Sequence, residues 1–142
     1  MTQSQILQPI VALLIWTMIM WAWMYATRIP AMSKRNVDIQ RLVNDPDDSL
    51  DRQLPVEVQW KAHNYNHLHE QPTVFYAVAL LLAFIGQGDG MNALLAWIYA
   101  GLRVIHSLVQ VTANKVMVRF ILFAVSSVVL IALIVRAAIA VF

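Results

Sequence analysis

The chain contains no cysteine among its 142 residues, which excludes several kinds of chemistry. Neither a disulfide nor a thiolate metal site can form, and no side chain can act as a cysteine nucleophile. Any thiol chemistry must therefore use a thiol that a substrate brings. Charged residues are also scarce, at 13% of the sequence, whereas hydrophobic residues make up 60%. A soluble globular domain has roughly 45–50% apolar residues, so this composition predicts an integral membrane protein.

Four apolar stretches account for the excess of hydrophobic residues. The first, residues 6–26, is uncharged and long enough to cross about 30 Å of hydrocarbon. Three more follow, of which the last two each contain one arginine: residues 73–85, 91–112 and 120–142. We therefore expect an all-α membrane protein that forms a four-transmembrane-helix bundle. Its single domain would span residues 1–142, with helices at about 4–28, 56–85, 91–112 and 116–141.

Three prolines indicate where these helices begin, end or bend. Pro30 should end the first helix, because the residue before a proline is pushed out of the α region. Pro55 suits the first turn of the second helix, and Pro72 inside that helix predicts a kink. Residues 29–54 form the longest polar section of the chain. Their composition is that of a solvated loop, with a lid over a cytoplasmic-side site as the alternative.

The distribution of basic residues predicts the orientation in the membrane. The first apolar stretch lacks the basic n-region and the cleavage pattern of a signal peptide, so we expect it to be retained. Basic residues gather in or beside the first connection and around the third, whereas residues 86–90 have none. By the positive-inside rule, both termini of this multi-pass protein would lie on the non-cytoplasmic side. A short chain without a targeting segment fits a bacterial inner membrane.

Polar residues at helical spacing mark two faces inside the predicted bundle. On the second helix, His63, Asn66, His67 and Glu70 share one face, while Asn64 and His69 would point elsewhere. Ionisable groups at membrane depth are costly, so they usually face other helices or a wet cavity and serve a function. This face is therefore where we expect the chemistry.

The third helix carries a matching face, made by Arg103, His106 and Gln110 at positions i, i+3 and i+7. An arginine and a histidine inside an apolar helix need partners. Glu70 is the acid best placed to be one, so we predict a contact from Glu70 to Arg103 or to His106. A polar cluster that only fixes helix packing is the alternative.

A metal site is a further alternative at this position. His63, His67 and Glu70 have the spacing of three ligands on one helix, and His106 could supply a fourth. A histidine pair at i, i+4 is nevertheless common without metal, and Arg103 and Arg119 would repel a cation. We therefore expect no metal.

These motifs resemble those of the MAPEG family, the membrane-associated proteins in eicosanoid and glutathione metabolism. The resemblance covers nearly the whole chain. On the second helix it rests on a basic residue, Ala-His, Asn, Glu, Pro and an aromatic: Lys61-Ala62-His63, Asn66, Glu70, Pro72 and Phe75. On the third helix, Arg103-Val104-Ile105-His106 resembles the family's Arg-x-x-His. Arg119 and Arg28 are similar to two arginines that contact glutathione in the family.

The resemblance implies a homotrimer with active sites between subunits and glutathione as the co-substrate. Arg119 would be catalytic, because a nearby guanidinium lowers the pKa of a thiol by favouring the anion. Five further residues would hold the co-substrate: Arg28, Asn66, Glu70, Arg103 and His106. The implied activity is that of a thiol transferase or peroxidase acting on lipophilic electrophiles. Membrane lipid and a lipophilic small molecule would be partners, and no nucleic acid is expected.

Several positions depart from the family pattern. Gln110 stands where the family has a tyrosine, and Phe120 and Phe123 stand where it has a hydroxyl donor and a second tyrosine. Lys61 and Asn64 replace arginines, and a lysine cannot make the same bidentate contact. Because some family members bind lipid without catalysis, a non-catalytic lipid-binding or accessory membrane protein is the alternative function.

Overall fold

A computed structural model of the chain describes residues 3–36, 38, 40–41, 44 and 53–142. These described residues form α-helices and no strand, as the predicted all-α class requires. The helices are α1 (Leu7–Lys34), α4 (Val56–His67), α5 (Gln71–Phe84), α6 (Met91–Thr112) and α7 (Val116–Val141). Most of the polar section predicted to be a loop or a lid lies outside the described residues.

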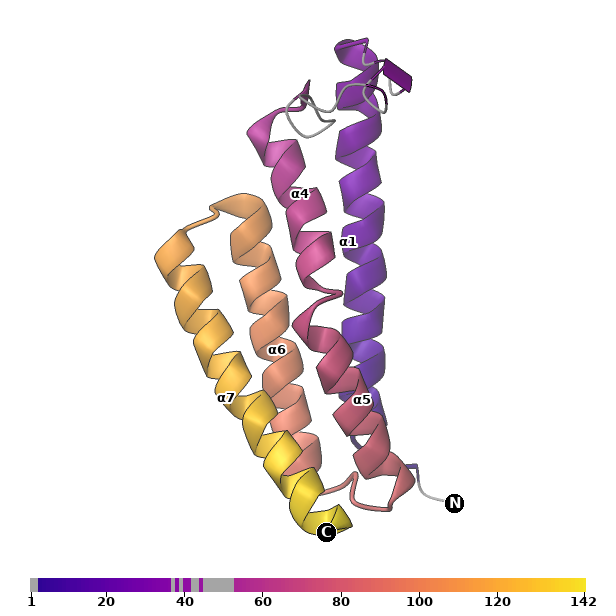
Figure 1. The fold of residues 1–142 in the computed structure, drawn as a ribbon, viewed down its shortest axis with the longest axis vertical. Coiled ribbons are helices and arrows are strands. Elements are labelled where there is room, and N and C mark those ends of the chain that lie inside the picture. The colour runs from indigo at the N-terminus through magenta and orange to yellow at the C-terminus, as the bar shows by residue number, and fades with distance from the viewer. Residues whose placement is uncertain (1–2, 37, 39, 42–43, 45–52) are drawn as a thin grey trace.

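The helices form an elongated bundle in which α4 and α5 follow each other in one direction, antiparallel to α1 and α6 (Figure 1). α1 packs along α4 and α5, and α6 packs along α4 and α7. Both chain termini lie at one end of the bundle, together with the connection between α5 and α6 (Figure 1). The C-terminal end of α1 and the connection between α6 and α7 lie toward the other end.

Three of these helices are long and apolar enough to cross a membrane, namely α1, α6 and α7. Their outward faces expose many large apolar side chains, whose hydration in water would be unfavourable and which lipid would cover. The chain is therefore an integral membrane protein. α4 and α5, with 12 and 14 residues, are each too short to cross alone. A fourth crossing, made by these two helices together, stays a prediction.

Pro30 does not end the first helix, contrary to the prediction, because α1 continues to Lys34. The fixed φ of proline is itself helical, and its exposed ring lies on the helix surface. The last turn is also held in place, since Arg35 Nη1 donates a hydrogen bond of 2.7 Å to the Gln53 carbonyl. α1 ends at Lys34, two residues before Asn36, whose φ of 49° is left-handed.

The second predicted helix is also corrected, since it is broken rather than kinked. α4 ends at His67 and α5 begins at Gln71, with Glu70 between them at φ −91° and ψ −94°. Pro72 has no N–H to donate to the Leu68 carbonyl, and its ring crowds the preceding turn. Within the first turn of α5, however, the missing N–H is no loss. Restarting the helix therefore satisfies the backbone better than bending it.

Below this break, an aromatic pair forms the centre of the core. Phe75 and Tyr99 are fully buried, and their rings stack with centroids 4.5 Å apart. Apolar side chains from α1, α5, α6 and α7 surround the pair, among them Leu13, Met20, Leu82, Ala96 and Leu133. This packing fixes α5 and α6 against each other immediately below the polar faces.

The residues before α1 are tied to the connection between α5 and α6. Ile6 N–H donates to the Gly88 carbonyl at 2.9 Å, and Gln5 N–H donates to Asp89 Oδ1 at 2.9 Å. The chain passes so close here that a Cβ on Gly88 would lie 2.7 Å from Ile6 Cγ2 and from Ser4 Cβ. Only glycine fits this approach without movement.

Gly88→Ala should therefore destabilise the protein by about 1–3 kcal/mol, because the added methyl overpacks this contact. Gly101→Ala is the matched control, since a Cβ at that helical position meets no atom within 4 Å of it. It should be neutral or stabilising by up to about 1 kcal/mol. Thermal unfolding in detergent, followed by tryptophan fluorescence, measures both. Equal loss of stability in the two variants would contradict the assigned contact.

Candidate functional site

The polar site lies where α4 ends, between α4, α6 and the start of α7. The last carbonyls of a helix have no partner within it, and a positive charge is favourable there. Arg103, on α6, uses this position, because its Nη2 donates to the His67 carbonyl at 3.4 Å. Its side chain is only 2% exposed. The break between α4 and α5 thus anchors the buried arginine.

Asn64 joins α4 to α6 one turn before the break. Ser107 Oγ donates to Asn64 Oδ1 at 2.8 Å, and both side chains are buried. The expectation that Asn64 points elsewhere was therefore wrong. Leu68 lies four residues after Asn64 and therefore on the same face of the helix. Burial of the apolar Leu68 side chain turns this face, and Asn64 with it, toward the interior. His63, Asn66 and Glu70 are consequently exposed in the described structure.

Several buried polar atoms in this cluster have no hydrogen-bond partner within the described part of the chain. They are Arg103 Nε and Nη1, His106 Nδ1, Gln110 Oε1 and Asn64 Nδ2. All four side chains are at most 4% exposed. Unpaired buried polar groups are rare in native proteins and are costly. Their concentration on one face indicates a place for a polar ligand that offers both donors and acceptors.

Two histidines and two further charges border these atoms. The rings of His67 and His106 lie edge to face with centroids 6.3 Å apart. Arg119 interacts electrostatically with both histidines. Glu70 Oε2 lies 3.3 Å from His67 Nδ1, and within the described residues it forms no ion pair with Arg103 or His106. The Glu70 charge does act on Arg103, but the ion pair that the structure gives this acid is with its neighbour His67, across the helix break.

Arg119 is positioned by the short connection that precedes α7. Its Nη1 donates to Asn114 Oδ1, while its buried Nε has no partner among the residues described. Asn114 has a left-handed φ of 49°, which asparagine tolerates better than most residues, and its N–H donates to the Val109 carbonyl at 2.6 Å. The sequence placed Asn114 in a connection but gave no sign of this role.

The structure brings only part of the predicted set together. Arg103, His106, Arg119 and Glu70 lie at the cluster, whereas Arg28 is half-buried on α1 and Asn66 is exposed on α4. Lys61 points toward α1, with its Nζ 5.3 Å from the centroid of the Trp23 ring.

The positions that depart from the family pattern differ in burial. Gln110 is buried in the cluster, but Phe120 and Phe123 are 64% and 42% exposed. Phe120 and Phe123 carry no hydroxyl group, so a substrate at the cluster would meet only apolar rings from these two positions.

A hydrogen-bonded chain below the cluster was not predicted. Tyr99 OH donates to Gln71 Oε1 at 3.1 Å, and Gln71 Nε2 donates to Ser127 Oγ at 2.8 Å. This chain joins α6, α5 and α7 and so fixes the start of α5 just after the break. The three residues lie on three different helices, so no spacing within one helix could indicate this chain.

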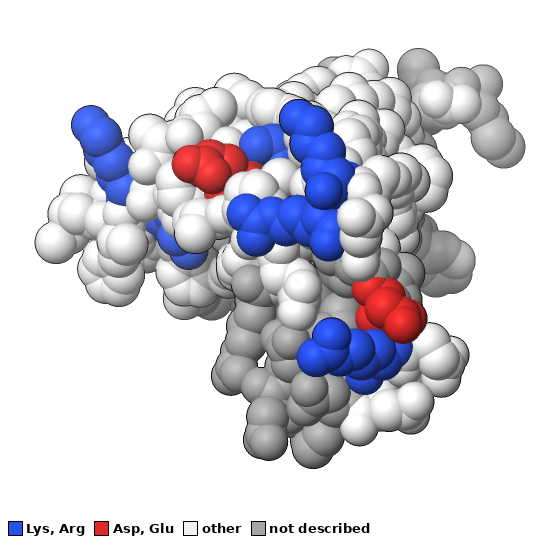
Figure 2. All heavy atoms as spheres, turned by 90° about the horizontal axis from the view of Figure 1, so that it is seen from above, with Lys and Arg blue, Asp and Glu red and all other residues white. Residues whose placement is uncertain are grey.

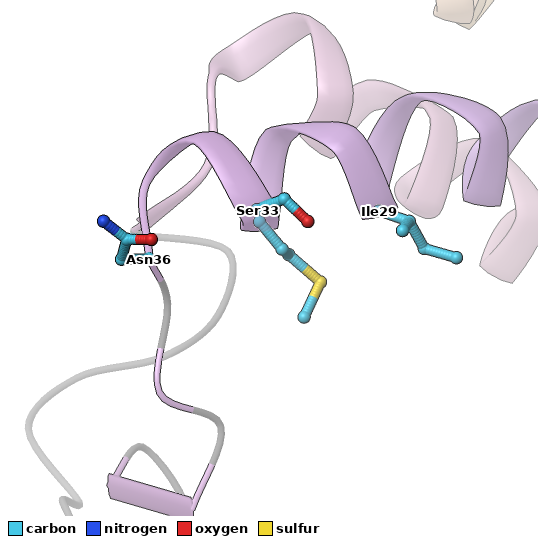
Figure 3. A pocket seen from close by; sticks show the side chains of 4 residues that line it. Ile29, Ser33 and Asn36 are labelled. Atoms are coloured by element: carbon cyan, nitrogen blue, oxygen red, sulfur yellow. The ribbon is translucent and has the colours of Figure 1, made fainter.

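Two other features lie apart from the cluster. The hollow at the end of α1 is lined by Ile29, Met32, Ser33 and Asn36 (Figure 3) and shares no lining residue with the cluster. Among the residues that the structure describes, no group of three or more His, Asp or Glu side chains is placed to hold a metal ion. The alternative of a metal bound by His63, His67 and Glu70 thus has no geometric support.

Comparison with known proteins places this arrangement in a family. Searches of curated protein sequences and of solved structures gave no match. A family model described as the MAPEG family matches residues 6–139, which is nearly the whole chain. With its membrane-spanning helices and the Arg103-x-x-His106 pair buried between them, the chain belongs to the MAPEG family.

Proposed function

We propose that the protein is a membrane-embedded transferase or peroxidase that uses glutathione, or a similar thiol, on lipophilic electrophiles. Membership of a family that includes glutathione transferases supports the proposal. The observation that carries it is the set of unpaired N–H groups on the buried Arg103. A buried guanidinium whose Nε and Nη1 have no acceptor among the described residues suits a ligand that brings a carboxylate.

The remaining atoms of the cluster fit the same kind of ligand. Gln110 Oε1 is an unpaired acceptor and Asn64 Nδ2 an unpaired donor, as peptide N–H and C=O groups would require. Glutathione, a tripeptide with two carboxylates, would supply the thiol that the cysteine-free chain lacks. His106 would support Arg103 from the next turn of α6.

Arg119 is the proposed catalytic residue. It lies half-buried at the start of α7, next to His67 and His106, with an Nε that has no partner in the described structure. Its charge would favour the anionic form of a thiol placed between it and the cluster. A lipophilic electrophile would reach this point from the bilayer, along the apolar outer surface of α7.

The exposed polar face of α4 supports a proposed homotrimer. Asn66 and Glu70 belong to the predicted binding set but are exposed in a single copy. A second copy against this face would bury them beside the ligand, as intersubunit sites require. Arg28, half-buried on α1, would contribute from the edge of the same cleft.

The charge distribution supports the proposed orientation. Figure 2 shows Lys and Arg side chains on the end of the bundle away from the termini. The ends of α1 and α7 there carry Lys34, Arg35, Lys115 and Arg119. We propose that this end is cytoplasmic, that both termini lie across the membrane, and that the membrane is a bacterial inner membrane.

A non-catalytic lipid-binding or accessory protein is the second candidate function. The specific observation that favours it is the hydrogen bond from Arg119 Nη1 to Asn114, which already engages part of the guanidinium. Phe120 and Phe123 also offer packing surface where an enzyme of this family would offer hydroxyl groups. Such a protein would use the same cleft for a lipid or for a partner helix.

Arg119→Ala tests the catalytic assignment. If the side chain stabilises the thiolate electrostatically, turnover of a generic electrophile with glutathione should fall by at least about 100-fold. Lys115→Ala removes a charge from the same end of α7 but should retain turnover. Both variants should elute as the wild type does in gel filtration. Wild-type turnover in the Arg119 variant would remove this residue from the mechanism.

Calorimetric titration of the detergent-solubilised protein with glutathione separates the two candidate functions. Binding should be measurable and should weaken by about 10-fold in Arg119→Ala, because a charge-assisted hydrogen bond is lost. Absence of binding at millimolar glutathione, together with a lipid that co-purifies, would favour the non-catalytic protein.

Asn114→Gly tests how Arg119 is positioned. Glycine keeps the left-handed backbone but removes the acceptor of Nη1, so kcat should fall roughly tenfold while KM for the electrophile stays unchanged. Asn36→Gly is the matched control, since Asn36 has the same φ of 49° at the end of α1. A fall in kcat that the control shares would point to general loosening of the helix ends instead.

A further inference from the structure

A second group of polar residues lies where the end of α7 meets the start of α6, and Figure 1 shows this end of the bundle beside the chain termini. Arg136, near the end of α7, donates from Nε to Asn92 Oδ1 at the start of α6. Asn92 Nδ2 in turn donates to the Gln87 carbonyl at 2.7 Å. Asn92 is only 5% exposed, so its amide holds the guanidinium in a fixed direction.

The charge of Arg136 is not matched by the residues around it. The ion pair between His67 and Glu70 lies at the break between α4 and α5, not at this cluster. Asp89 is the acid of the neighbouring connection, and its Oδ1 accepts the N–H of Gln5 instead. The two Nη groups of Arg136 have no hydrogen-bond partner among the described residues. Arg136 is exposed, so its Nη groups are open to an anion from outside the chain.

A hollow of about 250 Å³ adjoins the guanidinium. Gln87, Asn92 and Arg136 form its polar side, and Ile139 and Ala140 form its apolar side. Ile139 is 76% exposed, so this apolar edge continues into the outer surface of α7. A ligand with a charged group at one end and hydrocarbon at the other matches both sides.

The position of Arg136 along α7 places it near a membrane surface. The 26 residues of α7 span about 39 Å at 1.5 Å per residue, more than the hydrocarbon core of about 30 Å. Arg136 lies in the last two turns of this helix. Its long side chain can therefore reach the headgroup layer, where phosphates are abundant.

We propose that the hollow beside Arg136 binds the headgroup of an anionic phospholipid. The lipid phosphate accepts hydrogen bonds from the Nη groups, and the glycerol and first acyl carbons lie on Ile139 and Ala140. None of the described residues that line the hollow is acidic, so the ammonium of a zwitterionic headgroup would find no carboxylate among them. This lipid site shares no residue with the polar cluster around Arg103, so the proposal does not depend on the activity proposed for that cluster.

Native mass spectrometry of the full chain tests this site. The protein is released from detergent that contains equal amounts of phosphatidylglycerol and phosphatidylcholine with the same acyl chains. The wild type should retain phosphatidylglycerol over phosphatidylcholine by roughly fivefold, the effect of one basic side chain at a lipid surface. Arg136→Gln should retain the two lipids equally. Lys115→Gln, which removes one charge at the opposite end, should keep the wild-type preference.

A second variant distinguishes lipid binding from a role of Arg136 in folding. Ala140→Leu fills the hollow but leaves Arg136 and Asn92 in place, and it should also abolish the preference. Millimolar inorganic phosphate should not displace the retained lipid, because free phosphate makes no contact with the apolar edge. An unchanged preference in either Arg136→Gln or Ala140→Leu, or displacement by free phosphate, would overturn the proposal.

Discussion

Pro72 cannot donate a backbone hydrogen bond to Leu68, and the interruption that follows from this single missing donor organises the polar half of the bundle. It ends α4 at His67 and leaves a carbonyl that Arg103 can bind from α6. The same carbonyl also accepts the Glu70 N–H at 3.2 Å, so the turn that follows α4 and the Arg103 guanidinium share one acceptor. The position of the buried guanidinium therefore depends on where α4 ends.

The membrane makes this dependence stricter than it would be in water. A solvated arginine can exchange a lost partner for water, but one between apolar helices cannot. The stacked pair of Phe75 and Tyr99 and the Gln71 bridge hold α5 close to α6 just below the break. Because α5 and α6 are held together on one side of the break, the helices cannot rearrange to pair the buried polar atoms on the other side. Preorganised unpaired groups are what a binding site requires.

The sequence predicted the helical class and the location of the site better than it predicted the partners within it. Apolar runs indicate membrane helices directly, and the spacing of Arg103, His106 and Gln110 puts them on one face, where all three are buried. The orientation of α4 could not be read in this way. It depends on Leu68, a lone apolar residue, and on a break that uncouples the face of α4 from that of α5. Asn64 therefore turned inward and Glu70 outward, against the predicted polar stripe.

The continuation of α1 past Pro30 has a related cause. A helix can continue past a proline when tertiary contacts hold the residues that follow it. Here the Arg35 side chain donates a hydrogen bond to the Gln53 carbonyl, next to the start of α4. Local backbone preference sets the free-energy cost of a proline inside a helix, whereas tertiary contacts decide whether that cost is offset and the helix continues. Pro30 and Pro72 differ for that reason. Pro30 is exposed on a helix held at both ends, and Pro72 is buried at a point where a break supplies an acceptor to a charged side chain.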